Sequence, residues 1–214
     1  MLMYAKSETT IANILEAAQK LFLAKSYAEV TMADIAVAAE VTKGALYHHF
    51  AGKEALYLAM MLAEIAEKQA LMAEAVASKG SCYERLYCLT LNFFNLPDEK
   101  RKIMKLVRRD INIFKDPMRN SLIRAYQAAL PDQVETIIRD GIEVGELIEA
   151  DPRLLAWQYV AMVEVVLTDY AQQTLGNRED MADYVLSLFF KGAGQYSETL
   201  NNGRVLATPQ RFSE

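Results

Sequence analysis

Hydrophobic residues recur every three or four positions along almost the whole chain of 214 residues. This spacing places them on one face of an α-helix, whereas no segment shows sustained strand alternation flanked by hairpin turns. The pattern therefore predicts an all-α protein. In the first such segment, one apolar stripe predicts a helix from about Glu8 to Ala24, and its members are Ile11, Ile14, Leu15, Ala18, Leu21 and Phe22.

The segment from Thr31 to Leu56 reads TMADIAVAAEVTKGALYHHFAGKEAL and predicts two short helices joined by a tight turn. Thr31 and Thr42 stand where a hydroxyl can cap the start of each helix. The inward face carries apolar residues at helical spacing, namely Ile35, Ala36, Ala39, Val41, Leu46 and Phe50. With the first helix packed over this pair, residues 1–52 are expected to form a three-helix, helix-turn-helix domain.

The second of these short helices has an outer face of small and polar residues. At about 100° per residue, this face lies away from Leu46 and comprises Gly44, Ala45, Tyr47 and His48, with Lys43 at the flank. Such a face suits the approach of a helix to a DNA groove. The alternative is a helical hairpin in an ordinary α-helical core, with Tyr47 and both histidines as plain surface residues.

A long helix is expected from about Lys53 to Ser78, where Lys79-Gly80-Ser81 ends it. It would join the helix-turn-helix unit to a larger helical domain over residues 53–200. The further helices expected there cover Cys82–Asn95, Asp98–Phe114, Pro117–Glu146 with an interruption or kink at Pro131, Pro152–Leu175 after a cap at Asp151, and Arg178–Leu200. The segment 201–214 has no periodicity and is expected to be a loose tail.

The net charge of −5 argues against nonspecific nucleic-acid binding by the whole molecule. Even the first 53 residues carry as many acidic groups as lysines. Helix N-termini, hydroxyls and backbone amides must then supply much of any contact with DNA phosphates, and dimerisation would double that contact. The only two histidines are His48 and His49, so an enzyme built on a remote catalytic histidine is hard to place.

Cys82 and Cys88 are both expected to be small buried hydrophobes, because their spacing fits neither a metal nor a redox site. No metal and no cofactor are predicted. The start of the chain does not look like a signal peptide. The longest apolar run, Leu154–Thr168, contains Gln158 and Glu164 and falls short of the roughly 20 residues that a membrane span needs. A cytoplasmic protein without membrane contact is expected.

Two carboxylates in apolar surroundings are the best indication of a ligand site in the larger domain. Glu164 is the only charge between Arg153 and Asp169, and it shares a helical face with Trp157. Asp110 stands on the apolar side of its own helix. A carboxylate in such surroundings needs a partner, which could be an internal arginine, a neighbouring subunit or a cationic group of a ligand.

A basic run has the opposite sign and would suit an anionic ligand; its members are Lys100, Arg101, Lys102, Lys105, Arg108 and Arg109. Most of them fall opposite the apolar face of their helix, so we favour a solvated surface. Aromatic and methionine side chains could line a cavity, although at helical spacing they more often form plain core. These candidates are Phe93, Phe94, Met104, Tyr126, Trp157 and Met162.

The last two expected helices are apolar around more of their circumference than one packing face needs. In the second, one stripe contains Met181, Val185, Leu188 and Phe189, while further apolar surface remains at Tyr184, Leu186 and Phe190. A helix buried on two sides suggests a partner subunit, and a larger internal core is the alternative. The candidate interface residues are Tyr184, Val185, Leu188 and Phe189.

The helix-turn-helix segment resembles the DNA-binding domain of the TetR family of transcriptional regulators. The family pattern is Thr/Ser-x-Gly-x-Leu-Tyr-x-His-Phe with a following Lys-Glu, and the matching residues are Thr42, Gly44, Leu46, Tyr47, His49, Phe50, Lys53 and Glu54. One position departs from it, because the family usually places glycine at the turn and this chain has Glu40. A left-handed residue other than glycine costs roughly 1 kcal/mol.

The resemblance implies a homodimer joined by a four-helix bundle of the last two long helices, with a small-molecule cavity in each body. It implies that phosphates are held by Thr31, Thr42, Tyr47, His49 and Lys53, while the residues nearest the bases are Lys43, Gly44, Ala45 and His48. Candidate effector contacts are Phe93, Met104, Asp110, Tyr126, Trp157 and Glu164. An effector would shift the long helix so that the two reading helices no longer match successive major grooves.

The function expected is therefore that of a ligand-responsive regulator, most simply a repressor, with a double-stranded DNA operator, a small-molecule effector and a second copy of the chain as partners. One alternative is a helical ligand-binding or scaffold protein without DNA binding. The other alternative is an α-helical enzyme, but the sequence contains no nucleophile elbow, phosphate loop or metal-ligand spacing.

Overall fold

The predicted all-α architecture is confirmed. The computed structural model describes residues 2–193, without the side chains of residues 2–6, Met104 and Ala193. Its regular elements are the helices α1 to α11 and one short 3-10 helix, and this part of the chain contains no β-strand. The expected tail over residues 201–214 and the expected last turns of the final helix lie outside the described residues.

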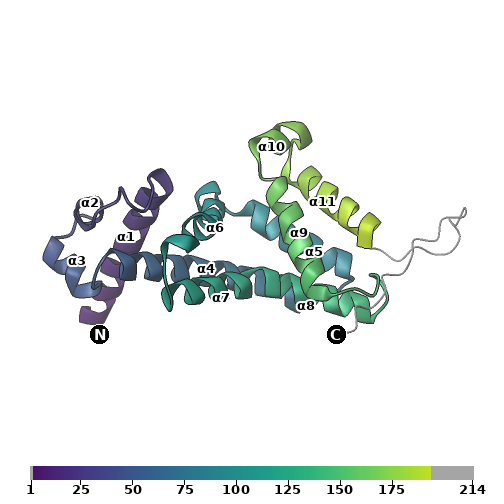
Figure 1. The fold of residues 1–214 in the computed structure, drawn as a ribbon, viewed down its shortest axis with the longest axis horizontal. Coiled ribbons are helices and arrows are strands. Elements are labelled where there is room, and N and C mark those ends of the chain that lie inside the picture. Colours follow the sequence, from purple (N-terminus) through teal and green to yellow (C-terminus); the bar gives the residue numbers. More distant parts are fainter. Residues whose placement is uncertain (1, 194–214) are drawn as a thin grey trace, which may run out of the picture.

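Three helices form a separate lobe at one end of the molecule, which we call the head: α1 (Leu2–Ala24), α2 (Met32–Ala38) and α3 (Lys43–His49) (Figure 1). Ile14, Ala18 and Phe22 of the predicted stripe are fully buried. The first helix begins at Leu2 rather than near Glu8. Residues 2–24 contain no proline or glycine that would prevent the helix from beginning this early.

The long helix α4 (Lys53–Ala77) runs from the head along the rest of the molecule, which we call the body (Figure 1). Its bounds agree with the predicted helix from Lys53 to Ser78. After Ser78 the backbone turns at Gly80, whose φ of 146° favours glycine. The helix α4 therefore belongs to both parts, because it packs on α1 of the head and on α5, α7 and α8 of the body.

The remaining helices of the body are α5 (Cys82–Asn95), α6 (Asp98–Asp110), α7 (Met118–Ala129), α8 (Pro131–Glu143), α9 (Pro152–Val165), α10 (Asp169–Leu175) and α11 (Arg178–Ala193). The predicted interruption at Pro131 is confirmed, because this residue begins α8. Asp151 caps α9, as its side chain accepts a hydrogen bond from the backbone of Leu154 at 2.7 Å. The helix predicted over 98–114 ends at Asp110 and continues as the 3-10 helix η1 (Ile111–Ile113).

One expected helix is wrong, because residues 152–175 form two helices. The chain leaves the α-helical path between Val165 and Asp169, and the Thr168 side chain caps α10 by accepting from the backbone N–H of Ala171. β-branched residues crowd this point and lower helix propensity, and a threonine hydroxyl competes for backbone N–H groups. The apolar pattern continues through the break, so periodicity alone does not reveal it.

The core of the body forms where α5 packs on α11 and α4, and where α8 packs on α9. Tyr159 of α9 is fully buried there, and its hydroxyl lies 2.5 Å from the hydroxyl of Thr90. Cys82 is buried as predicted, and burial raises the pKa of its thiol to about 12. The expectation for Cys88 is wrong, since its side chain is exposed. It lies on the face of α5 opposite the core.

Candidate DNA-binding surface and effector cavity

The first helix of the helix-turn-helix unit is held by a reciprocal cap. The Thr31 backbone N–H donates to Asp34 Oδ2 at 2.9 Å, and the Asp34 N–H donates to Thr31 Oγ1 at 3.2 Å. The Thr31 hydroxyl also donates to the Asp34 carboxylate, and these hydrogen bonds hold the pKa of Asp34 below its usual value. This cap fixes the start of α2, and with it the direction in which the turn and α3 leave.

The turn between α2 and α3 has the left-handed conformation that the family resemblance implies. Glu40 has a φ of 54°, the one positive φ of a non-glycine residue in the described part of the chain. The backbone N–H of the next residue, Val41, donates to Ala36 O at 3.0 Å and closes the turn. The Glu40 side chain is exposed, so the conformation is imposed by the turn and not by packing of that side chain.

The second helix presents its predicted outer face to solvent. Thr42 caps it by accepting from the Ala45 N–H at 3.1 Å, while Leu46 is fully buried and Phe50 is 8% exposed. On the opposite side Tyr47 is 54% exposed. Of the other candidate DNA contacts, Lys43, Gly44 and His48 are exposed and Ala45 and His49 are partly buried. The two buried residues therefore orient the whole outer face.

Lys53, predicted as a phosphate contact, also ties the start of α4 to the loop between α1 and α2. Its amine donates to Tyr27 O at 2.8 Å and to Val30 O at 3.0 Å, and it lies 4.3 Å from the centre of the Tyr27 ring. A lysine ammonium has three donors, so one remains for a ligand. Tyr27 carries no signal of this role in the sequence, because only the fold brings it to Lys53.

The body contains a cavity of about 320 Å³ between α5, α6, α7 and α9. Its residues are Phe93, Arg101, Lys105, Arg108, Tyr126, Leu130, Val163, Glu164, Leu167 and Thr168. Three of the predicted effector contacts, Phe93, Tyr126 and Glu164, line it. A fourth, Trp157, stacks on Tyr126 with ring centres 6.3 Å apart. A volume and an apolar lining of this kind suit a small organic molecule.

Glu164 has a partner inside the chain. One oxygen of its carboxylate forms an ion pair with Arg108 of α6, and the other accepts from the Tyr126 hydroxyl at 3.4 Å. Of the three partners left open by the sequence, the internal arginine is therefore the one observed. The basic run also differs from expectation, because Arg101, Lys105 and Arg108 border the cavity instead of forming only a solvated surface.

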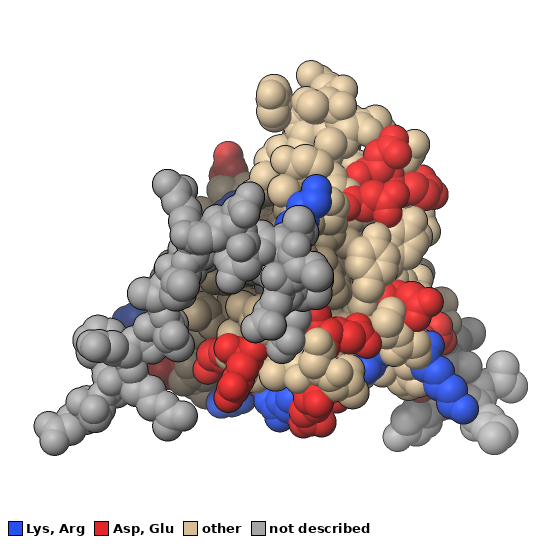
Figure 2. All heavy atoms as spheres, turned by 90° about the vertical axis from the view of Figure 1, so that its right-hand side faces the viewer, with Lys and Arg blue, Asp and Glu red and all other residues tan. Residues whose placement is uncertain are grey.

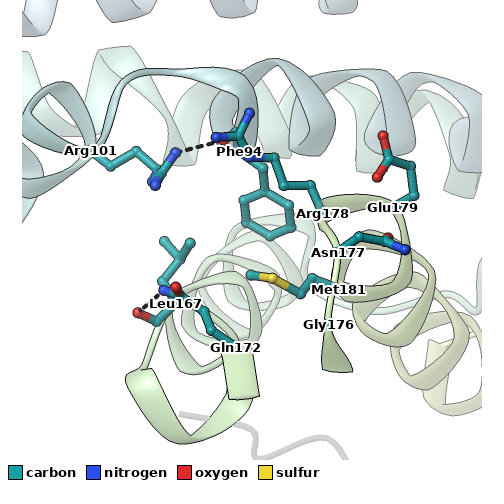
Figure 3. Close-up of a pocket in the computed structure, with 9 residues that line it drawn as sticks. All are labelled: Phe94, Arg101, Leu167, Gln172, Gly176, Asn177, Arg178, Glu179 and Met181. Carbon is teal, nitrogen blue, oxygen red and sulfur yellow. Dashed lines mark hydrogen bonds between the residues drawn. The ribbon is translucent and has the colours of Figure 1, made fainter. Parts of the chain in front are cut away.

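A second hollow, of about 420 Å³, opens beside the first and shares Arg101 and Leu167 with it. Figure 3 shows these two side chains on one side, facing Asn177, Arg178, Glu179 and Met181 across the opening. Its rim is rich in polar groups, and the Arg101 guanidinium is held by Phe94 O at 2.6 Å. The apolar cavity next to it is therefore the better candidate for an effector site.

Asp110, another predicted effector contact, does not lie at the cavity. Its carboxylate is 3% exposed at the junction of head and body, where it accepts from Tyr57 OH at 2.8 Å and from Arg109 Nε at 2.6 Å. Arg109 also donates to the backbone carbonyl of Phe22 in α1 at 3.4 Å. Burial and the hydrogen bond to Asp110 raise the pKa of Tyr57. The partner that this buried carboxylate required is thus again an internal arginine.

Residues 14–60 match the family model of bacterial regulatory proteins of the tetR family. The chain is 29% identical over 153 residues to the HTH-type transcriptional regulator TtgR of Pseudomonas putida, covering 66% of this chain and 72% of that protein. The chain thus carries a helix-turn-helix domain of the tetR type. It is a DNA-binding regulator of the helix-turn-helix type, and the residues matched by the family model contain α2, α3 and the start of α4.

Solved structures share the fold of this chain. A tetR-family regulatory protein from Rhodococcus RHA1 superposes with a TM-score of 0.75 at 19% identity, covering 88% of this chain and 98% of that one. The transcriptional regulator FadR from Bacillus subtilis, solved in complex with stearoyl-CoA, gives a TM-score of 0.72 at 19% identity, with coverage of 85% and 98%.

The candidate dimer surface of this chain lies on α9 and α11. A groove of about 380 Å³ runs between these helices, and Leu154 and Leu188 on its walls are 59% and 46% exposed. Tyr184 is also exposed on α11. Val185 and Phe189 are expected on the same surface as Leu188, but both are buried within the protomer, and of the two only Phe189 lines the groove. At the end of the body opposite the head, uncharged residues fill the upper centre of the visible surface, with acidic groups beside them and both acidic and basic groups along the lower edge (Figure 2).

No helix in the described part of the chain is both long and apolar enough to cross a membrane. Among the same residues, no three histidine, cysteine or acidic side chains are placed to hold a metal ion. The side chain of Met104, the remaining predicted effector contact, is not among those described.

Proposed function

We propose that the protein is a homodimeric transcriptional repressor that leaves its operator when a small molecule enters the cavity lined by Phe93, Tyr126 and Glu164. Residues 1–52 would read DNA, and residues 53–200 would bind the effector and the second protomer. The observation that carries the DNA-binding part is the outer face of α3, held outward by the buried residues Leu46 and Phe50.

In this proposal the outer face of α3 enters the major groove. A Cβ at Gly44 would meet only the Thr42 hydroxyl, at 3.9 Å, so no packing within the chain requires glycine there. Its small size would instead let the helix backbone approach the bases, beside Lys43, Ala45 and His48. Thr31, Thr42, Tyr47, His49 and the third donor of Lys53 would contact phosphates.

The dimer would form through the exposed apolar residues of α9 and α11. On α9, Leu154, Ala161 and Val165 are exposed at helical spacing, and on α11 Tyr184 and Leu188 are exposed four residues apart. Two copies of this surface would bury it in a bundle of four helices. A dimer also doubles the few phosphate contacts of a head without excess positive charge.

Effector release is supported by the cavity and by the FadR structure, which shows that a protein of this fold can be solved with stearoyl-CoA bound. Because α6 contributes to the cavity and also contacts the head through Arg109 and Asp110, a change at the cavity can reach the head. An effector lowers operator affinity only if it binds the DNA-free arrangement more tightly.

The test is a gel shift with DNA from upstream of the protein's own coding region, combined with unbiased selection of bound sequences. We expect a palindromic site and binding that falls steeply with salt. The variant Tyr47→Ala serves as the matched negative control, because its exposed side chain leaves the fold intact. Absence of any selected sequence with a folded dimer would support instead a helical ligand-binding or scaffold protein.

A further inference from the structure

The cavity of the body has an apolar interior and a positively charged rim. Phe93, Leu130, Val163 and Leu167 form its apolar walls. Three cations, Arg101, Lys105 and Arg108, border it, against a single carboxylate, Glu164. A cationic ligand would therefore meet an excess of like charge at this rim, whereas an anion would meet a favourable field.

The three cations differ in how firmly they are held. The Arg101 guanidinium is already held within the chain, since it donates to Phe94 O and Leu96 O and pairs with Asp98. Lys105 is exposed and forms no ion pair with any residue that the structure describes. Lys105 is therefore available to a ligand without breaking an existing contact.

Arg108 can exchange its partner at low cost. The side chains of Arg108 and Glu164 are 59% and 33% exposed, so water screens their ion pair. Exposed pairs of this kind contribute only about 0–1 kcal/mol. An anionic group placed between Lys105 and Arg108 would gain two cations while displacing only this weak contact with Glu164.

We propose that the effector is an amphipathic anion, with a carboxylate or phosphate group bound by Lys105 and Arg108 and an apolar portion in the cavity. This proposal rests on the function proposed above and adds the chemical class of the effector. Glu164 then acts as the internal competitor of the ligand: it pairs with Arg108 when the cavity is empty and is displaced when the anion binds.

The helix α6 connects Arg108 at the cavity with the contact between body and head. Arg108 is followed on α6 by Arg109 and Asp110, which contact Phe22 O of α1 and the Tyr57 hydroxyl of α4. A change of partner at Arg108 therefore occurs one turn or less from the contact between body and head. Tyr57 is a positioning residue in this route, because it does not touch the cavity.

The binding part can be tested without DNA, because Trp157 is the only tryptophan and stacks on Tyr126 at the cavity. Its fluorescence would be titrated with decanoate, decyl phosphate, decanol and decyltrimethylammonium, which share one apolar chain length. We expect at least one of the two anions to bind about tenfold or more tightly than decanol, a difference of about 1.4 kcal/mol. Equal affinity for decanol, or tighter binding of the cation, overturns the proposal; decanoate and decyl phosphate together show which anionic group fits.

Single variants separate an effector site from a merely structural ion pair. Lys105→Gln and Arg108→Gln should each weaken binding of the preferred anion by about fivefold to tenfold. The matched control is Lys102→Gln, which removes a cation from the same helix outside the cavity and should leave the affinity unchanged. Glu164→Gln should strengthen anion binding by about threefold or more, because the competing carboxylate loses its charge. Unchanged or weakened binding in a folded Glu164→Gln variant contradicts the competitor role.

The coupling is tested with operator DNA and the variant Tyr57→Phe, which removes only the hydroxyl. It should bind the anion with wild-type affinity and show a smaller anion-dependent loss of operator affinity; full coupling in this variant overturns the route through Asp110. Failure of the two proposals is distinguishable. If the wild type binds no operator but still selects anions by Trp157 fluorescence, the proposed function fails and the ligand class stands.

Discussion

The head and the body of this protein are stabilised by contacts of different range along the sequence. In the head, the contacts that orient α3 join residues three to five positions apart, such as Thr31 with Asp34 and Val41 with Ala36. In the body, the contacts that build the cavity and its link to the head join residues far apart, such as Arg108 with Glu164 and Tyr57 with Asp110. A local motif can therefore be recognised from sequence, whereas the effector site depends on how distant helices meet.

The head and the body also differ in how many cations lie at their candidate binding sites. The reading face of α3 has few cations, and its approach to DNA would depend on Gly44, hydroxyls and helix starts. The rim of the cavity gathers three cations of α6 around a single carboxylate. In a chain of net charge −5, more cations thus gather at the cavity rim than on the reading face of α3.

The largest effect is expected where the body meets a second protomer. Leu188→Glu places a carboxylate in the apolar surface of α9 and α11, and an unpaired buried charge costs several kcal/mol. The dimer dissociation constant should rise by about a hundredfold or more, and operator binding should be lost with it. Sedimentation equilibrium measures this change, with Leu188→Met as the control that keeps volume and polarity. A folded Leu188→Glu protein that remains dimeric would place the interface elsewhere.

The second-largest effect is expected on operator affinity, from substitutions on the outer face of α3. Tyr47→Ala should weaken operator binding by about tenfold across sequences, because it removes a phosphate contact and no buried side chain. His48→Ala should instead alter base preference. Lys53→Ala should weaken binding and also lower the melting temperature, since its amine holds Tyr27 O and Val30 O.

Quantitative gel shifts and thermal melts on these three variants and on Tyr47→Phe separate the two roles. An unchanged operator affinity in a folded Tyr47→Ala, Lys53→Ala double variant would mean that α3 is oriented differently. An unchanged melting temperature for Lys53→Ala would mean that its two backbone contacts do not stabilise the head.

The smallest effect concerns the turn of the head. Glu40→Gly should raise the free energy of unfolding by up to about 1 kcal/mol, because glycine adopts a φ near 54° without strain. Removal of a carboxylate near the DNA phosphates should also strengthen operator binding slightly. The matched variant Glu40→Ala removes the same charge but keeps the strain, so thermal melts of the pair isolate the backbone contribution. A Glu40→Gly protein no more stable than Glu40→Ala would show that the turn carries no strain.

Much of the fold could be predicted from sequence because its helices begin and end on local signals. The helices α4 and α5 lie close to their predicted bounds, and α2 and α3 begin directly after the predicted caps Thr31 and Thr42. The break at Thr168 was missed because the apolar spacing continues through it. Cys88 and the surface of α11 were also misjudged, since helical spacing shows that residues share a face but not which neighbour covers it.

The candidate sites likewise divide into features fixed by local sequence and features fixed by tertiary packing. Sequence alone determined the caps at Thr31 and Thr42 and the outward direction of α3, because backbone geometry and nearby side chains fix these features. The left-handed turn at Glu40 followed from the family resemblance. The sequence also showed that Asp110 and Glu164 needed partners, but tertiary structure decided which partners they have. Only the packing of α6 against its neighbours places Arg108 beside Glu164 and Arg109 beside Phe22 O, since helices distant in sequence meet only when the whole core has formed.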